Sequence, residues 1–348
     1  MRKTMDSRFE GQPSIFKLAA SEIGFGGGER IFLDIAKALV KLDISVVIST
    51  SRNSKLGQAV NEDDTFNALE RNQKSKATVL VANDFKSLFQ SSLSFGIRRG
   101  LICHGPWELT WKKKVYLKLF KVHLLCVSNY VAGFTQRGLR LHRSKIDVLK
   151  YGPDLREINV VSDGKVLARE EFGILPEDTV VGSLSRYHSV KRIDELIEMF
   201  RGREEILLLG LSTGFNTQDE IQTKKIVDNI KLPPNVKIFE NVKSEVFLNA
   251  IDILISLSSS ETLGLTFLEA SARGVPSFTT AKGGPNDFLI HGLNGYFLKH
   301  ESLRENAEEF FNLIKDKRVL DRLSKNAKDM NHHRSPEISA IQIIGILR

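Results

Sequence analysis

The sequence predicts an α/β protein of two domains, each with a parallel β-sheet flanked by helices. Short apolar runs rich in β-branched residues alternate with segments of helical period, and this order repeats after a polar connector, residues 156–169. Strands that alternate with helices favour parallel sheets, because parallel strands need crossover connections. The 348 residues are enough for two domains, each with its own core.

In the first half, a helix with apolar residues at helical spacing is expected over Glu29–Leu42, and residues 51–77 read as irregular or surface helix. The expected strands are Ser14–Ala20, Ile44–Thr50, Thr78–Asn83, Gly100–His104, Leu124–Ser128 and Ile146–Leu149.

The second half repeats the pattern. Its expected strands are Thr179–Ser185, Glu205–Gly210, Val236–Phe239, Ile251–Leu257 and Val275–Thr280. Its expected helices are Val190–Phe200, Ile221–Ile230, Leu265–Arg273, Asn286–His291, Arg304–Lys315 and Lys317–Asp329.

Composition and cysteine use predict a cytoplasmic protein. No apolar run approaches the length of a membrane span, and the first residues are polar and charged, unlike a signal peptide. The two cysteines, Cys103 and Cys126, each lie inside an apolar run, so we expect buried thiols in a reducing compartment and not a disulfide.

The net charge is +8, and it is concentrated between Lys86 and Lys145, where 12 Lys and Arg accompany one acid, Glu108. Such a surface attracts phosphates, anionic lipids or nucleic acid. Residues 111–121 mix aromatics and leucines with five lysines, which suits either an ordinary surface helix or a helix on an anionic membrane. The lysines are Lys112, Lys113, Lys114, Lys118 and Lys121.

A glycine-rich loop, Gly24 to Gly28, separates the first strand from the first helix. The dinucleotide fingerprint fails there, because its sixth position is Glu29 and not glycine. Backbone amides of Gly26 and Gly27 could still face an anion at the helix N-terminus, so both are expected to be donor-binding residues. The alternative is a plain tight turn.

Two glutamates, Glu261 and Glu269, stand eight positions apart around the loop that follows a buried strand. Ligands of open α/β sheets bind beyond the carboxyl ends of strands. Carboxylates there can accept hydrogen bonds from sugar hydroxyls, and Gly264 lets the amides near Leu265 and Thr266 approach a phosphate. The alternative is a capping box, Thr266-x-x-Glu269, in which Glu269 only caps its helix.

These residues resemble the glutamate–seven residues–glutamate motif of retaining GT-B glycosyltransferases of family 4, the glycosyl transferases group 1. The segment Arg186 to Lys191 is similar to the arginine and lysine that follow the first strand of that family's second domain. Gly283-Gly284-Pro285 and the stretch His291 to Gly295 match its usual spacing. The resemblance covers most of the chain and implies two Rossmann-like domains with parallel sheets that face each other across a cleft.

The resemblance implies a nucleotide-sugar donor, most simply a UDP- or GDP-sugar, with no cofactor. Arg186 and Lys191 would stabilise the charge that develops on the leaving diphosphate, a task for fixed cations. The sequence contains no Asp-x-Asp, so we expect no metal. Cations before a helix oppose its dipole, which disfavours a purely structural role.

The resemblance also assigns roles to single residues. Glu269 would hold the ribose hydroxyls and Glu261 the donor sugar. The nucleotide base would stack near Phe239. His104, with the glycine that follows it, would lie near the sugar and could hydrogen-bond a hydroxyl, although a histidine at a strand end is often only structural.

The chain departs from the family pattern near the expected base pocket. An acidic, glycine-rich turn is replaced by Leu211 to Gly214, and the common glycine after Phe239 is replaced by Glu240-Asn241. Asp287 stands where glutamate is commoner. These changes leave the identity of the nucleotide open and do not affect the expected fold.

We therefore expect a retaining, metal-independent glycosyltransferase that moves a hexose-type sugar to a saccharide or lipid-linked saccharide, in cell-surface polysaccharide or glycoconjugate synthesis. Residues 1–158 would bind the acceptor, 159–334 the nucleotide sugar, and 335–348 would cross back to the first domain. The protein could also bind the inner face of the membrane as a peripheral protein.

The rivals are a nucleotide-sugar epimerase or phosphorylase on the same fold, or a non-catalytic basic binding protein. Nucleic acid is not the expected partner, because aromatics are sparse among the 12 cations outside residues 111–120.

Overall fold

The structure is a computed structural model of the 348-residue chain. It describes residues 15–21, 26–51, 54–67, 77–91, 97–105, 110–139, 145–154, 164–214, 216–299, 302–330 and 333–347. Two sequence predictions fall outside these ranges: Gly24, in the glycine-rich loop, and the expected domain boundary between residues 158 and 159.

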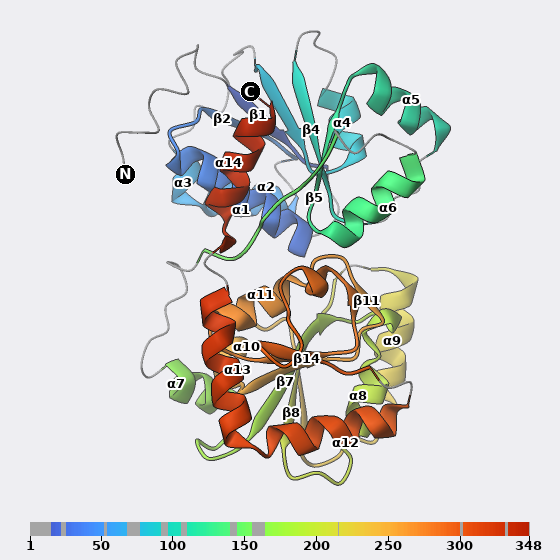
Figure 1. Ribbon diagram of the computed structural model, residues 1–348, viewed down its shortest axis with the longest axis vertical. Helices are drawn as coiled ribbons and strands as arrows, with labels where there is room; N and C mark the ends of the chain where they lie inside the picture. Colours follow the sequence, from blue (N-terminus) through green and yellow to red (C-terminus); the bar gives the residue numbers. More distant parts are fainter. Residues whose placement is uncertain are drawn as a thin grey trace. The chain divides into compact units, whose positions relative to one another are not determined.

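The chain divides into two compact units. Unit 1 comprises Met1–Val127, Val131–Tyr151 and Pro336–Arg348, and unit 2 comprises Ser128–Tyr130 and Gly152–Ser335. Each unit is an α/β layer structure around one parallel sheet (Figure 1). In the described part of the chain, no helix has the length and apolar character needed to cross a membrane.

The sheet of unit 1 has six strands in the order β2-β1-β3-β4-β5-β6, and every pairing is parallel. The strands are β1 (Phe16–Ala19), β2 (Val46–Ser49), β3 (Val79–Ala82), β4 (Arg98–Cys103), β5 (His123–Cys126) and β6 (Ile146–Val148). All six predicted strands are confirmed. Cys103 and Cys126 pair in register, and both are free and buried.

The helices of unit 1 are α1 (Gly27–Lys41), α2 (Lys55–Glu62), α3 (Asp64–Asn67), α4 (Phe85–Ser91), α5 (Trp111–Leu119), α6 (Asn129–Leu139) and α14 (Pro336–Leu347). The predicted helix at residues 29–42 corresponds to α1. Its buried side chains, among them Ile31, Phe32 and Ile35, form the apolar face that the helical spacing predicts.

The last helix, α14, packs against α1 and against β4, although it follows the whole of unit 2 in the sequence (Figure 1). Arg98 Nη1 donates to the carbonyl oxygen of Leu347 over 3.2 Å. Gln342 joins α14 to the end of β6, since it accepts from the Lys150 amide at 2.8 Å and donates to the Val148 carbonyl at 3.2 Å. No helix was expected here from the sequence.

The sheet of unit 2 also has six parallel strands, in the order β14-β12-β10-β7-β8-β9. They are β7 (Val180–Arg186), β8 (Ile206–Ser212), β9 (Val236–Glu240), β10 (Ile253–Ser256), β12 (Ser277–Thr279) and β14 (Gly295–Phe297). Beside it, β11 (Ser260–Glu261) and β13 (Lys282–Gly283) form a two-stranded parallel ladder. The five strands predicted for this half are confirmed; β14 was not predicted.

The helices of unit 2 are α7 (Gly164–Glu171), α8 (Ile193–Met199), α9 (Gln218–Asp228), α10 (Ser244–Ala250), α11 (Leu265–Ala272), α12 (Leu303–Ile314) and α13 (Lys317–Met330). Two apolar clusters line the sheet: one takes side chains from α8, α12 and α13, the other from α7, α10 and α11. The sheet is therefore buried on both faces, as parallel sheets are.

Two helix predictions are wrong in this unit. Val190–Phe200 is not one helix: a 3₁₀ turn, η3 (Ser189–Lys191), is separated from α8 by Arg192, whose φ of +52° is left-handed and interrupts helical geometry. Asn286–His291 is not helical as a whole. The 3₁₀ turn η4 lies at Gly284–Asp287, with Pro285 as its second residue, where a missing backbone N–H costs no hydrogen bond.

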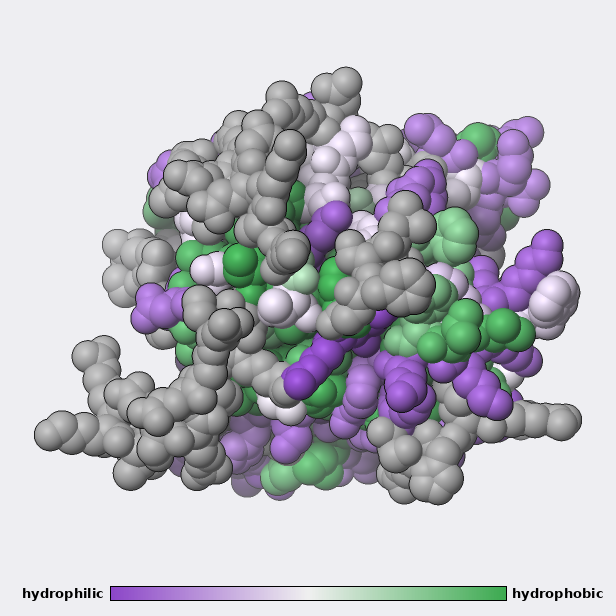
Figure 2. Space-filling view, turned by 90° about the horizontal axis from the view of Figure 1, so that it is seen from above, coloured by the Kyte–Doolittle hydropathy of each residue, from purple (hydrophilic) through white to green (hydrophobic). Residues whose placement is uncertain are grey.

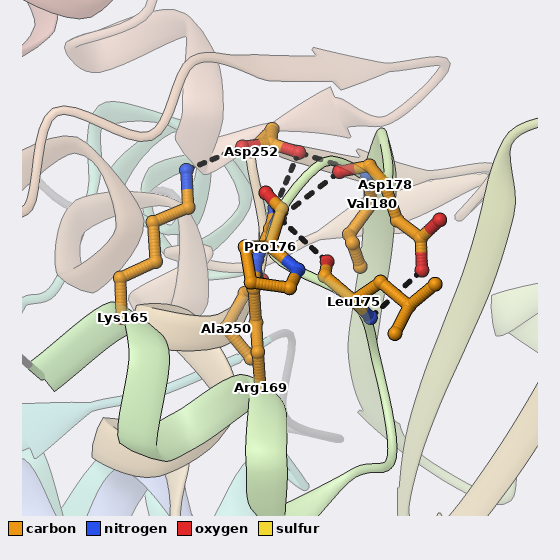
Figure 3. Close-up of polar contacts among 8 residues, drawn as sticks. All are labelled: Lys165, Arg169, Leu175, Pro176, Asp178, Val180, Ala250 and Asp252. Carbon is orange, nitrogen blue, oxygen red and sulfur yellow. Dashed lines mark hydrogen bonds and ion pairs between the residues drawn. The ribbon is translucent and has the colours of Figure 1, made fainter.

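A buried arginine ties together the amino-terminal edge of this sheet (Figure 3). Arg169, on α7, is buried and donates to the carbonyls of Ala250, Leu175, Pro176 and Asp178. Its Nη2 also donates to Asp252 Oδ2 over 2.8 Å. The same carboxylate oxygen accepts from the amide of Val180, the first residue of β7, and Lys165 pairs with the other oxygen.

We expect Arg169→Ala and Asp252→Ala to lower the free energy of unfolding by about 3–5 kcal/mol, because each leaves buried partners of a charged network unpaired. Lys165→Ala is the matched control: it removes an ion pair from a half-exposed side chain and should cost no more than about 1 kcal/mol. Urea denaturation followed by circular dichroism measures the difference. Equal losses in all three variants would contradict the role assigned to Arg169.

Candidate functional site

Arg186 and Lys191 lie in the loop after β7, before α8 begins. Arg186 is the last residue of β7, and its side chain is exposed. Lys191 ends η3, and α8 starts only at Ile193. Neither cation therefore lies inside the first turn of that helix, and both stand at the carboxyl-end edge of the sheet, where ligands of such sheets bind.

Lys191 and Glu261 form an ion pair, so the structure brings together two residues that the sequence analysis assigned to the site. Both side chains are mostly buried, with 18% and 16% exposed. Ser258 Oγ also donates to Glu261 Oε1 over 3.0 Å, and Ser258 Oγ lies 2.8 Å from Ser256 Oγ. The carboxylate is thus held in one orientation, and the ammonium of Lys191 has further N–H groups for a ligand.

The backbone of Glu261 is held by the glycine pair of the ladder. Glu261 pairs with Gly283, and a Cβ at residue 283 would lie 2.3 Å from the Glu261 carbonyl oxygen. That approach, together with a φ of +120°, admits only glycine. The Gly283-Gly284 motif therefore has a structural role: Gly283 allows β13 to pair closely with β11, the strand that carries the Glu261 carboxylate.

Gly264 is the N-cap of α11, and this position excludes the capping-box interpretation of Glu269. Its φ is +83°, it serves as N-cap, and no side chain caps the helix. Because the helix begins at Leu265, Thr266 is its second residue and cannot be the cap, so the capping-box interpretation of Glu269 is wrong. The amides of Leu265 and Thr266 belong to the first turn, whose N–H groups have no acceptor within the helix and can face an anion.

Glu269 lies on the same helix, in its second turn, and is 5% exposed. Its carbonyl oxygen accepts from Arg273 Nη1 at 3.0 Å. A carboxylate this deeply buried is rare unless it is paired or serves a function. Glu261 and Glu269 thus flank the N-terminus of α11, one before it and one within it.

Sequence analysis missed the residue that anchors the cationic loop. Asp219, on α9, accepts from the Ser189 amide at 2.9 Å and from Ser189 Oγ at 2.7 Å. These hydrogen bonds from Ser189 lower the pKa of Asp219. Because Ser189 lies between Arg186 and Lys191, Asp219 holds the segment that presents both cations. No sequence signal pointed to this role, because the predicted helix began only at Ile221, whereas α9 begins at Gln218 and has Asp219 in its first turn.

His188 belongs to the same anchor. Its Nδ1 accepts from the Val190 amide at 3.2 Å and lies 3.1 Å from Asp219 Oδ2. Desolvation, aided by the charges of Arg186 and Lys191, lowers the pKa of His188. A neutral imidazole is what the hydrogen bond from Val190 requires.

In unit 1, His104 lies after β4 and faces the start of α1. Its Nε2 is 2.7 Å from Asn83 Oδ1, and a Cβ on Gly28 would lie 3.4 Å from the imidazole ring. Burial lowers the pKa of His104 to about 4, although Asp84 acts in the opposite direction. The imidazole is therefore neutral near pH 7. With Nε2 donating to Asn83, Nδ1 is left as an acceptor for a hydroxyl.

Gly26 and Gly27 begin α1, but the Gly26 amide already has a carboxylate. It donates to Glu29 Oε2 over 3.0 Å, the backbone half of a capping box, since glycine has no side chain to supply the other half. Burial raises the pKa of Glu29. Gly27 is exposed as the first residue of the helix. A phosphate at this turn would meet the Glu29 carboxylate.

Phe239 lies within β9 and packs into the domain. Its ring centroid is 4.9 Å from that of Phe172, edge to face, and both belong to the apolar cluster beneath α7 and α10. The ring is partly buried, so it offers less surface to a nucleotide base than a residue at the strand end would.

The residues that depart from the family pattern are fixed by polar contacts at the ends of β8 and β9. Asn241 Oδ1 accepts from the Thr213 amide at 2.9 Å, and its Nδ2 donates to Thr213 Oγ1 at 2.8 Å. Glu240 accepts from the Tyr187 hydroxyl at 3.0 Å and pairs with Lys224. Those side chains replace the glycine-rich turn with a rigid polar surface.

The described residues contain no group of three or more His, Cys, Asp or Glu side chains able to hold a metal ion. In unit 2, Lys191 pairs with Glu261, which lies just before the N-terminus of α11 in the chain, and Glu269 lies on the same helix. His104, Gly26 and Gly27 form a separate cluster in unit 1.

Two α/β units, each with a parallel sheet, form the architecture of GT-B glycosyltransferases, and comparison with solved structures shows the same fold. A glycosyltransferase from Rickettsia africae has a TM-score of 0.80 at 16% identity and covers 97% of this chain and 98% of its own. The Anabaena protein HepE, in complex with UDP, has a TM-score of 0.73 at 18% identity, with 96% and 99% covered.

Residues 166–330 match the family model of the glycosyl transferases group 1, so this segment is a domain of that family. It contains Arg186, Lys191, Glu261 and Glu269. The N-acetyl-α-D-glucosaminyl L-malate synthase of Bacillus anthracis is 26% identical over 167 residues, covering 46% of this chain and 42% of that protein.

A capsular polysaccharide biosynthesis glycosyltransferase, CapM of Staphylococcus aureus, is 25% identical over 194 residues, covering 53% of this chain and 50% of that protein. The matches thus span about half the length of these curated relatives, or less.

The pKa of His104 predicts how stability depends on pH. An unfolded chain protonates this histidine near its ordinary pKa of 6.5, whereas the folded protein does so only near 4. The free energy of unfolding should therefore fall as the pH drops from 6.5 to 4, by at most about 3 kcal/mol from this residue. Above pH 6.5 the histidine is neutral in both states and contributes no dependence.

We expect His104→Gln to flatten this part of the profile, as measured by urea denaturation at a series of pH values. His333→Gln, at an exposed position, is the control and should keep the slope of the wild type. The same slope in His104→Gln as in the wild type would show that the His104 imidazole is not responsible.

Proposed function

We propose that this protein is a glycosyltransferase that transfers a hexose-type sugar from a nucleotide-sugar donor to a saccharide or lipid-linked saccharide acceptor. The observation that carries the proposal is the contact between Lys191 and Glu261 beside the N-terminus of α11, inside the segment that matches the glycosyl transferases group 1. A cation, a sugar-binding carboxylate and free helix amides are the groups that a nucleotide sugar requires.

Transfer breaks the bond between the anomeric carbon and the diphosphate oxygen, so negative charge develops on the leaving phosphate. Arg186 and Lys191 would stabilise this charge, together with the amides of Leu265 and Thr266. We propose that these cations take the place of a metal, so that the reaction needs none. Glu269 would bind the ribose hydroxyls.

We further propose that the anomeric configuration is retained. The acceptor oxygen would bond to the anomeric carbon on the face that the diphosphate leaves, and its proton would pass to the departing phosphate oxygen. No protein base is then needed. Glu261, oriented by Ser258 and Lys191, would accept hydrogen bonds from the sugar hydroxyls and fix the ring during the exchange.

The donor nucleotide is proposed to be UDP, with GDP as the alternative. HepE, which shares the fold, has been solved with UDP and with UDP-glucose, which supports UDP. The Thr213–Asn241 and Glu240–Lys224 contacts lie at the expected base-binding edge and would decide between the two bases. We place the base against this edge, near Phe239.

The acceptor would bind unit 1, where Nδ1 of His104 can accept from a sugar hydroxyl. The names of CapM and of LpsE, a lipopolysaccharide core biosynthesis glycosyltransferase, support a role in cell-surface polysaccharide synthesis. A cytoplasmic enzyme that works on a lipid-linked saccharide would meet it at the inner face of the membrane.

The first test is donor binding, measured by thermal shift with UDP, GDP and their common sugar conjugates. A ligand at about 100 times its Kd should raise the melting midpoint by roughly 5–10 °C. Glu269→Ala and Lys191→Met should abolish or strongly reduce the shift, while Glu245→Ala, at an exposed carboxylate of the same unit, should keep it. If no nucleotide shifts the wild type, a basic binding protein becomes the better interpretation.

Product analysis separates the proposed reaction from its rivals. A transferase releases nucleoside diphosphate in proportion to the sugar transferred, an epimerase releases none, and a phosphorylase requires inorganic phosphate. The anomeric coupling constant of the product, measured by NMR, reports retention, and activity in EDTA reports metal independence. Release of diphosphate with an inverted product would contradict the retaining scheme.

Asp219 provides a second test, because it anchors the loop without belonging to the proposed donor site. Asp219→Ala should lower kcat/KM about tenfold or more, since a misplaced group costs catalysis out of proportion to its displacement. Asp228→Ala, on the same helix, removes only a long contact of 3.8 Å to Lys224 and is the control. Unchanged kcat/KM in Asp219→Ala would show that the loop needs no anchor.

A further inference from the structure

One row of apolar side chains on α5 faces solvent. Trp111, Val115 and Leu119 are 70%, 55% and 71% exposed, and their spacing of four residues aligns them along one side of the helix. A helix at a protein surface normally turns its apolar stripe toward the core. Here the apolar row points away from it.

The opposite side of α5 does pack against unit 1, so the exposed row is not a misplaced core face. Leu117 is buried, and Tyr116 contacts Phe85, Phe89 and Phe120 with ring centroids 5.6, 5.7 and 4.6 Å away. These contacts fix the rotation of the helix about its axis. The exposure of the apolar row follows from that rotation.

The apolar surface extends beyond the helix, because Phe89 of α4 is 61% exposed while its ring packs against Tyr116. In the view of this end of the molecule, hydrophobic and hydrophilic side chains lie next to each other (Figure 2). We call Phe89, Trp111, Val115 and Leu119 the apolar ridge.

Lysines flank the ridge on both sides. At 3.6 residues per turn, Lys114 and Lys118 lie along one side of the row and Lys112 along the other. All three are exposed, as is Lys121 just after the helix. Lys113 instead turns inward, with its Nζ 5.5 Å from the centroid of Phe85. The helix and Lys121 carry five lysines and no acidic residue.

We infer that α5 docks on an anionic lipid bilayer, with the ridge entering the headgroup region and the flanking lysines contacting lipid phosphates. A tryptophan and aliphatic side chains between lysines suit this interface, where the apolar part leaves water and the ammonium groups keep polar partners. The proposed acceptor is a lipid-linked saccharide, and the inference adds to that proposal the surface of the protein that contacts the membrane. It is argued from the geometry of α5.

Charge complementarity selects the bilayer over a protein partner. Protein interfaces are depleted in lysine relative to the rest of the surface, whereas anionic lipid favours lysine next to inserted apolar side chains. An anionic membrane thus accounts for the ridge and for its lysines together, and a second copy of the chain would bring like charges into contact.

The test uses the full chain and vesicles of phosphatidylcholine, with or without phosphatidylglycerol, in a flotation assay. The wild type should float with the anionic vesicles and not with the neutral ones. Lys114→Gln with Lys118→Gln should weaken the partition about 30-fold, and Trp111→Ser with Leu119→Ser at least as much. Ile221→Ser with Ile226→Ser is the control, because these α9 residues are 55% and 54% exposed but belong to unit 2.

Tryptophan fluorescence locates the contact. In a Trp107→Phe background, Trp111 is the only remaining tryptophan, and its emission should shift to shorter wavelength with anionic vesicles. Flotation without this shift would place the contact elsewhere and overturn the inference, as would equal binding to neutral vesicles or no binding. A wild-type dimer that becomes monomeric in Trp111→Ser with Leu119→Ser would assign the ridge to a protein interface instead.

These outcomes are independent of the proposed reaction, because the vesicles contain neither donor nor acceptor. The ridge variants should keep the thermal shift with nucleotide, which also shows that they fold. If the wild type binds nucleotide but does not float, only the inference about the ridge is wrong. If it floats but binds no nucleotide, only the proposed donor site is wrong.

Discussion

Every pairing in both six-stranded sheets is parallel, and this constraint determines where the functional groups can lie. Parallel strands return to the same edge, so the loops after successive strands meet there although they are distant in the sequence. Lys191 follows β7 and Glu261 follows β10, 70 residues apart, and they form an ion pair. In unit 1 the same constraint brings His104, after β4, to Asn83, after β3.

The two edges of the unit 2 sheet have different tasks. At the amino-terminal edge, Arg169 and Asp252 satisfy backbone groups from three segments and fix where β7 and β10 begin. At the carboxyl ends of the strands, Arg186, Lys191 and Glu261 are charged groups that can bind a ligand. Because the starts of β7 and β10 are fixed, the residues that follow the ends of these strands have defined positions. The geometry of the site therefore depends on contacts at the opposite end of the sheet.

Sequence patterns predicted the strands well, because buried parallel strands are short apolar runs bounded by polar loops. The resemblance to the glycosyltransferase family, and not the strand pattern, predicted that Lys191 and Glu261 share a site. The patterns could not predict Asp219 as an anchor or the packing of Phe239 on Phe172, since both depend on tertiary neighbours. The break at Arg192 was missed because its left-handed backbone favours glycine, and arginine gives no signal for it. The fold was thus more predictable than the site.

The position of α14 has a consequence for the order in which the chain can fold. Ala340, Ile343, Ile344 and Leu347 are buried, and α14 contacts α1 and β4, which are made more than two hundred residues earlier. During synthesis, unit 2 has all its strands before the ribosome has released the last helix of unit 1. Synthesis of unit 1 therefore begins before that of unit 2 but is completed after it, and the apolar surface that α14 covers stays exposed until α14 has been made.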